Sequence, residues 1–113
     1  MGLREWSEWR VFPDPRNGEE LVAPFGPGCY ELRHRRSRQL ILFGSGGHAA
    51  ERMTSLLPAP LGCGTRKNAA KRDHVFAHLG DVEYRTISFL VEGEATEFER
   101  GLKLNRSRYF FPT

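Results

Sequence analysis

Residues 28–44, GCYELRHRRSRQLILFG, decide the fold. Apolar and polar residues alternate over 29–34, and 39–44 contain a short apolar run, so both segments are predicted to be β-strands. The connection between them, RRSR, is too short for the crossover that a parallel pair needs. The centre of the molecule is therefore predicted to be an antiparallel hairpin with a basic turn.

Two helices are predicted to follow this hairpin. The first comes after the turn SGG, in the segment HAAERMTSLL, where Ala49, Met53 and Leu56 have the spacing of one helix face. Prolines directly after that segment forbid its continuation. The second helix is predicted over residues 65–79, with Thr65 as its N-cap.

A third strand and a last helix complete the pattern. Residues 82–89 are predicted to be a strand, and 92–104 a helix that packs through Ala95, Phe98 and Leu102. The order is strand, strand, helix, helix, strand, helix. It predicts an α+β fold with a small antiparallel or mixed three-stranded sheet flanked by helices.

The length of 113 residues suits a single domain with one modest core. We expect that domain to cover residues 1–113, with a core over 26–110 and a segment over 1–25 that packs on it. The segment is rich in aromatic residues and then in proline and glycine. A short helix over residues 5–10 is one alternative for its start.

Composition narrows the class of protein. Hydrophobic residues make up 39% and charged residues 27%, close to ordinary globular proteins. No apolar run approaches the roughly 18 residues needed to cross a bilayer, and the start of the chain does not have the pattern of a signal peptide. Cys29 and Cys63 are far apart and suggest reduced thiols rather than a disulfide scaffold or a zinc ribbon. A cytoplasmic protein without a membrane partner is expected.

Basic residues gather in three clusters although the net charge is only +3. Such clusters favour a phosphate-rich partner, and the alternative is that they are solvated faces. We expect a nucleic acid, with DNA favoured over RNA. The residues expected to contact it are Arg35, Arg36, Arg38, Arg66, Lys67, Lys71, Arg72 and Lys103.

Two charged residues border the packed faces of their predicted helices. Glu99 comes four residues after Ala95, and Arg52 lies beside the stripe that contains Ala49. A carboxylate at the rim of a core is costly unless a cation or a donor satisfies it. The alternatives to a functional role are a structural arginine partner for Glu99 and a salt bridge from Arg52 to Glu51.

These positions resemble the GIY-YIG nuclease domain. Gly28-Cys29-Tyr30 matches GIY, Leu42-Phe43-Gly44 stands where YIG belongs, and Arg52 follows that glycine by eight residues. An alanine four residues before Glu99 also fits the family pattern. The resemblance covers roughly residues 26–110 and is to the small single-domain bacterial members.

The resemblance implies a divalent-metal-dependent endonuclease that hydrolyses phosphodiester bonds in DNA. Tyr30 would help to activate a water, although its phenol, with a pKa of about 10, needs positive charge nearby to ionise. Arg52 would brace the phosphate, and Glu99 would hold Mg²⁺ or Mn²⁺. The three residues are expected to converge in one shallow basic groove.

The sequence departs from the family pattern at several positions. Leu42 replaces the tyrosine of YIG, and Ser45 stands where many members have lysine. Leu56 replaces a histidine or tyrosine, and Phe111 lies near the place of a terminal asparagine. A catalytically degraded nucleic-acid-binding module is therefore an alternative. A protein-interaction domain that uses its terminal aromatic residues is a weaker one.

Other polar residues are candidates for the missing groups. Tyr84 could return a phenol to the site, and His48 could return a donor or base near the phosphate. A packing role for Tyr84 and a helix-start role for His48 are the alternatives. His74 and His78 lie four residues apart and are expected to be a surface pair rather than a metal site. The oligomeric state stays open.

Overall fold

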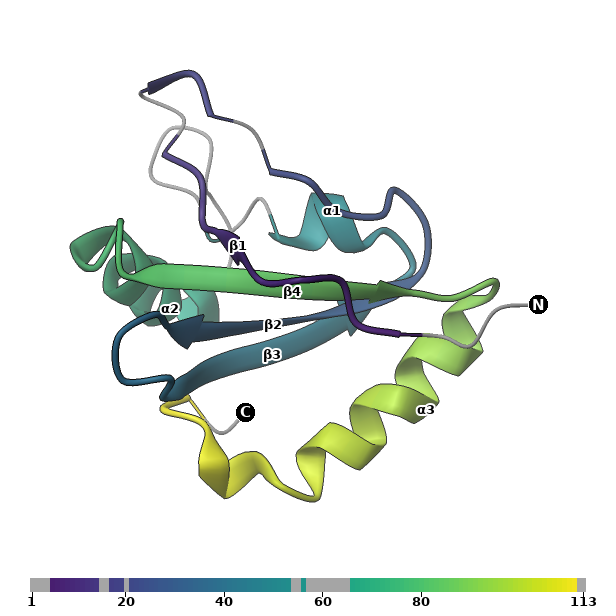
Figure 1. Ribbon diagram of the computed structural model, residues 1–113. Coiled ribbons are helices and arrows are strands. Elements are labelled where there is room, and N and C mark those ends of the chain that lie inside the picture. Colours follow the sequence, from purple (N-terminus) through teal and green to yellow (C-terminus); the bar gives the residue numbers. More distant parts are fainter. Residues whose placement is uncertain (1–4, 15–16, 20, 54–55, 57–65, 112–113) are drawn as a thin grey trace.

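The computed structural model describes residues 5–14, 17–19, 21–53, 56 and 66–111. The fold is α+β, as predicted, with a four-stranded antiparallel sheet in the order β1-β4-β2-β3 (Figure 1). Its elements are β1 (Arg10–Val11), β2 (Gly28–His34), β3 (Leu40–Gly46), α1 (Ala49–Met53), α2 (Arg66–Ala77), β4 (Val82–Ser88), α3 (Glu92–Lys103) and a 3-10 helix (Arg106–Arg108).

The hairpin of β2 and β3 forms as the sequence predicts, with Tyr30 opposite Gly44 and Leu32 opposite Leu42. The register then shifts, so that Arg33 pairs with Leu40 and Ile41 is an extra residue. Such a bulge lets both Ile41 and Leu42 enter the core. The strand also continues to Gly46, so it includes the first two residues of the SGG segment that was predicted to be a turn.

The two faces of the sheet carry different layers. Figure 1 shows α1 on one face and α3 on the other. The larger core cluster lies on the α1 and α2 face, where Leu32, Met53 and Val75 are buried together. A smaller cluster on the α3 face contains Cys29 and Ala95. Each fully buried aliphatic side chain contributes about 1.5–3 kcal/mol, so the larger cluster carries most of the stability.

The N-terminal segment adds the fourth strand. Residues 5–9 contain no helix, and β1 pairs with β4 instead. The backbone N–H of Ser7 donates to Thr86 O at 2.7 Å, and that of Phe12 donates to Val82 O at 2.8 Å. The prediction of three strands was therefore one short, because a two-residue strand next to β4 leaves little local pattern in the sequence.

The C-terminal tail closes part of the opposite edge of the sheet. Tyr109 is buried and bridges to Leu40, and the next two backbone N–H groups donate to Leu40 O and Ile41 O at 2.9 and 2.8 Å. Residues 109–111 therefore pack against the sheet. None of the helices in the described ranges is long and apolar enough to cross a bilayer.

Candidate functional site at the edge of β3

Tyr30 lies across the backbone of the edge strand. A Cβ atom built on Gly44 would come within 2.3 Å of the Tyr30 hydroxyl oxygen, closer than real Cβ contacts allow. Glycine is therefore required at position 44 for steric reasons, not for a special backbone angle. The pairing of Tyr30 with Gly44 brings the phenol of β2 towards the outer edge of β3.

Arg52 reaches the same place from α1. Its guanidinium donates a hydrogen bond to the Tyr30 phenol oxygen. A Cβ atom on Gly46 would lie 3.0 Å from Arg52 Cδ, so a second glycine makes room for the stem of the arginine. The helix that carries it begins at Ala49, and the carbonyl oxygen of His48, the residue before it, accepts from the backbone N–H of Arg52 at 3.0 Å.

Glu99 comes from α3 and is held by Ser45 between these two glycines. The Ser45 Oγ donates to Glu99 Oε1 at 2.7 Å. Glu99 is half-buried next to the fully buried Ala95, so it borders the packed face as predicted. Within the described part of the chain its partner is this serine and not an arginine.

The strand register shows how the three groups meet. Tyr30 and Arg52 lie on the α1 face, whereas Ser45 is opposite Cys29, on the α3 face. The expectation that all three share one groove is therefore wrong. Glu99 approaches from the other side and acts on Tyr30 across β3, which is the outermost strand of the sheet.

The electrostatics of Tyr30 follow from this arrangement. Burial raises the pKa of its phenol, the Arg52 charge and hydrogen bond lower it, and Glu99 raises it, with a net increase. The phenol therefore stays protonated at neutral pH. Burial and then Glu99 raise the pKa of the neighbouring Cys29 thiol to about 12, so this free cysteine is an inert core residue.

The donor set at Glu99 suits a hard cation with few protein ligands. Ser45 donates to Oε1, and Oε2 has no hydrogen bond or ion pair among the described residues. No group of three histidine, cysteine or acidic side chains that could hold a metal is found among the described residues. Mg²⁺ commonly takes one or two carboxylates and completes its shell with water and phosphate oxygens, so one glutamate is compatible with it.

Tyr84 and His48 adopt the alternative roles given above. The Tyr84 ring is 1% exposed and packs against Phe12, and its hydroxyl accepts from the Val22 backbone N–H at 2.9 Å. His48 is exposed at the start of α1, with Nδ1 3.2 Å from Phe25 O. These contacts favour a core residue and a helix-start residue over catalytic replacements.

Leu42 and Leu56 are core residues as well. They are 1% and 2% exposed and belong to the larger cluster. Leu42 stands where the resemblance predicted a tyrosine, and Leu56 where it predicted a histidine or a tyrosine. Both positions are therefore filled by buried aliphatic side chains. The edge of β3 retains one phenol, one guanidinium and one carboxylate.

The predicted nucleic-acid contacts divide between the two faces of the sheet. Arg35 and Arg36 stay near the β2–β3 turn, with Arg35 Nη1 3.3 Å from Gly80 O. Lys71 and Arg72 lie on α2, and Lys103 is exposed at the end of α3. The side chains of Arg66 and Lys67 lie outside the described part, as does Thr65. Lys71 and Arg72 therefore lie on the opposite face of the sheet from Lys103, because α2 and α3 cover opposite faces.

The structure contains a cluster of three histidines that was not predicted from the sequence. His34, from β2, places Nε2 3.1 Å from His74 Nε2, and its Nδ1 lies 3.1 Å from Asp81 Oδ2. His78 stacks on His74 with ring centroids 4.4 Å apart. The expected surface pair is therefore part of a partly buried trio. In the sequence, the only sign of the third member, His34, was its position at the end of the predicted strand.

Comparisons with known proteins add no identification. No protein-family model matches the chain, and neither the curated proteins nor the solved structures contain a match.

Proposed function

We propose that the protein is a divalent-metal-dependent endonuclease of the GIY-YIG type that hydrolyses phosphodiester bonds in DNA. The observation that supports this best is the hydrogen bond from Arg52 to the Tyr30 phenol at the Gly44–Gly46 edge, with Glu99 close enough from the other side of β3 to raise the pKa of that phenol. Each group comes from a different element, and each glycine there makes room for a side chain. A basic protein surface would supply non-specific affinity for the DNA backbone.

The residues have separate roles in this proposal. Arg52 binds the scissile phosphate and stabilises the negative charge that develops on it. Tyr30, as a protonated phenol held by Arg52, orients the attacking water through a hydrogen bond. Glu99 would hold Mg²⁺ or Mn²⁺, which would supply a Lewis acid for the phosphate oxygens and lower the pKa of a bound water.

A second candidate is a nucleic-acid-binding module that keeps the fold without cleavage. The burial of Leu42 and Leu56 favours it, because both positions lack a polar group that the family pattern contains. This candidate predicts salt-sensitive DNA binding and no product at any protein concentration.

Cleavage of labelled DNA decides between the two. Single-stranded, duplex and forked substrates would be incubated with Mg²⁺ or Mn²⁺ and, separately, with a chelator. We expect metal-dependent product, with activity lowered about a thousandfold or more in Glu99→Gln and in Arg52→Ala. Glu97→Gln is the matched control, because Glu97 lies on the exposed side of the same helix.

The control variant should cut like the unchanged protein. Unaltered cleavage by folded Glu99→Gln would remove Glu99 from the site. No cleavage of any substrate, combined with DNA binding, would favour the binding module.

A further inference from the structure

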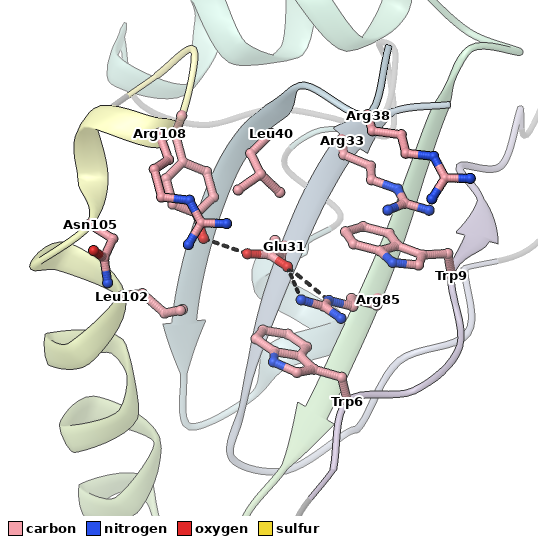
Figure 2. Close-up of a pocket in the computed structure, with 11 residues that line it drawn as sticks. Trp6, Trp9, Glu31, Arg33, Arg38, Leu40, Arg85, Leu102, Asn105 and Arg108 are labelled. Atoms are coloured by element: carbon pink, nitrogen blue, oxygen red, sulfur yellow. Dashed lines mark hydrogen bonds and ion pairs between the residues drawn. The ribbon is translucent and has the colours of Figure 1, made fainter. Parts of the chain in front are cut away.

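A second polar site lies on the α3 face, beyond Tyr30 along β2. It is a pocket of about 290 Å³ between the N-terminal segment, the sheet and the C-terminal end of α3. Figure 2 shows Glu31 at its floor, the two tryptophans on one side and the C-terminal residues on the other. The residues of the lining that bear most on binding are Trp6, Trp9, Glu31, Arg38, Arg85 and Arg108.

The floor of the pocket is neutral in charge. Glu31 is 3% exposed, and its Oε1 accepts from Arg85 Nε and Nη2 at 2.8 and 2.7 Å. Its Oε2 accepts a short hydrogen bond from the Tyr109 hydroxyl. Burial and then Glu31 raise the pKa of Tyr109, so this phenol remains a donor. The only carboxylate of the lining is therefore fully occupied and does not call for a cation.

One wall is a stack of alternating tryptophans and arginines. Arg85 Cζ lies 4.5 Å from the Trp6 ring centroid and 4.6 Å from that of Trp9, and Arg33 Cζ lies 4.0 Å from Trp9. Arg33 also pairs with Glu83 at 2.5 Å. Cation–π contacts and ion pairs together hold the wall rigid. Within the described ranges neither indole N–H has a hydrogen-bond partner, so both donors are available.

The rim carries unbalanced positive charge. Arg38, from the β2–β3 turn, and Arg108, from the 3-10 helix, are both exposed. Neither guanidinium has an ion-pair or hydrogen-bond partner among the described residues. Arg38 also has a φ of 63°, a left-handed conformation that is unusual for a residue with a Cβ. The fold therefore brings two separate basic clusters of the sequence to the mouth of one cavity.

We propose that this pocket binds a phosphate monoester, either that of a free nucleotide or that at the 5′ end of a nucleic acid. Arg38 and Arg108 would bind the phosphate oxygens from the rim, and the indole N–H groups would donate from the wall. The fork of N–H donors on a guanidinium can bind two oxygens of one phosphate at once. The cavity is close in size to the lower end of ordinary ligand sites. Arg33 and Arg85 both lie over the Trp9 ring, so we expect recognition through charge and not through stacking on Trp9.

The binding does not depend on cleavage at the edge of β3. The pocket residues of β2, Glu31 and Arg33, follow Tyr30 in the strand and face α3. A phosphate bound there would belong either to a free nucleotide or to a nucleic acid. The same site serves both, and titrations with the two kinds of ligand distinguish them.

Intrinsic fluorescence reports on this pocket directly, because the chain contains two tryptophans and both line it. The protein would be titrated with inorganic phosphate, AMP, adenosine and a short oligonucleotide with and without a 5′-phosphate. We expect a saturable change with AMP or with the 5′-phosphorylated oligonucleotide and none with adenosine. Saturation by AMP indicates a free nucleotide, and saturation by the phosphorylated oligonucleotide alone indicates a nucleic-acid end.

Variants separate the pocket from general surface charge. The double variant Arg38→Gln, Arg108→Gln should weaken binding on the order of tenfold or more. Arg106→Gln is the matched control, since Arg106 is exposed on the same 3-10 helix but does not line the pocket. Both variants should keep the circular dichroism of the unchanged protein. Equal binding by the double variant, equal weakening by Arg106→Gln, a response to adenosine or no response to any phosphate compound would each overturn the proposal.

Discussion

Glu31 and Glu99 are two carboxylates associated with the same side of the sheet, in opposite surroundings. Glu31 is buried and neutralised by Arg85 and Tyr109. Glu99 is partly exposed, is held by the neutral Ser45 hydroxyl and acts on Tyr30. A carboxylate with strong partners on both oxygens stabilises the fold, whereas one with a single neutral donor suits the ligand-binding role that we propose for Glu99.

The same contrast separates the arginines of the pocket. Arg33 and Arg85 are held by glutamates and tryptophans, and Arg38 and Arg108 stand at the rim. The first two shape the cavity and the last two give it an excess of positive charge. Burial and pairing, not residue type, therefore distinguish structural from ligand-binding groups.

Removing each carboxylate in turn should give the largest difference in the free energy of unfolding between the two regions. Glu31→Ala leaves Arg85 and the Tyr109 hydroxyl without their acceptor, so we expect a loss of about 3 kcal/mol in the free energy of unfolding. Glu99→Ala should cost about 1 kcal/mol or less, because its partner is neutral and the site is partly solvated. Urea unfolding of both variants measures this difference. Equal losses would break the distinction between the two glutamates.

A change at Gly44 tests the steric basis of the edge site. The added methyl of Gly44→Ala would overlap the Tyr30 hydroxyl, so Tyr30 must move, and we expect a loss of about 2 kcal/mol. Gly93→Ala is the control, because nothing lies within 4 Å of its Cβ position in α3. That variant should gain about 0.5–1 kcal/mol from helix propensity. Thermal unfolding compares them, and an unchanged Gly44→Ala would contradict the close approach.

The Tyr109 hydroxyl provides a finer test of the pocket floor. Tyr109→Phe keeps the packing of the ring on Phe43 but removes the donor to Glu31. We expect about 1–1.5 kcal/mol less stability, because Arg85 still satisfies the other oxygen. Tyr109→Ala, which also removes the ring, should lose clearly more in the same urea experiment. Identical values for the two variants would mean that the hydroxyl contributes nothing.

The three histidines should have the smallest effect, which is a dependence of the stability on pH. Burial first, and then His78 and His34, lower the pKa of His74 below its usual 6.5. A base whose pKa is lower in the folded state binds fewer protons there, so stability is present above pH 6.5 and is lost as the pH falls below it. Unfolding followed from neutral pH to roughly pH 5 should show this decline. His74→Gln should reduce the slope, and an identical slope would exclude His74 as its source.

The local elements were predictable because each follows from residues close in sequence. The hairpin, β4 and α3 appear where periodicity places them, and Glu99 borders the packed side of its helix. The position of Ser45 against Glu99 was not predicted, although a serine between two glycines on an edge strand is a usable signal. The short β1 and the contact of His34 with His74 lie outside local periodicity.

The sequence by itself determined the α+β class, the hairpin and the residue types available for chemistry. Only the tertiary structure decided that Glu99 approaches Tyr30 across an edge strand and that Tyr84 is a core residue. It also decided that Arg38 and Arg108 share one pocket. The physical reason is that strand and helix periodicity depends on neighbours along the chain. Pairing, burial and charge balance depend instead on groups that meet only after the sheet has formed.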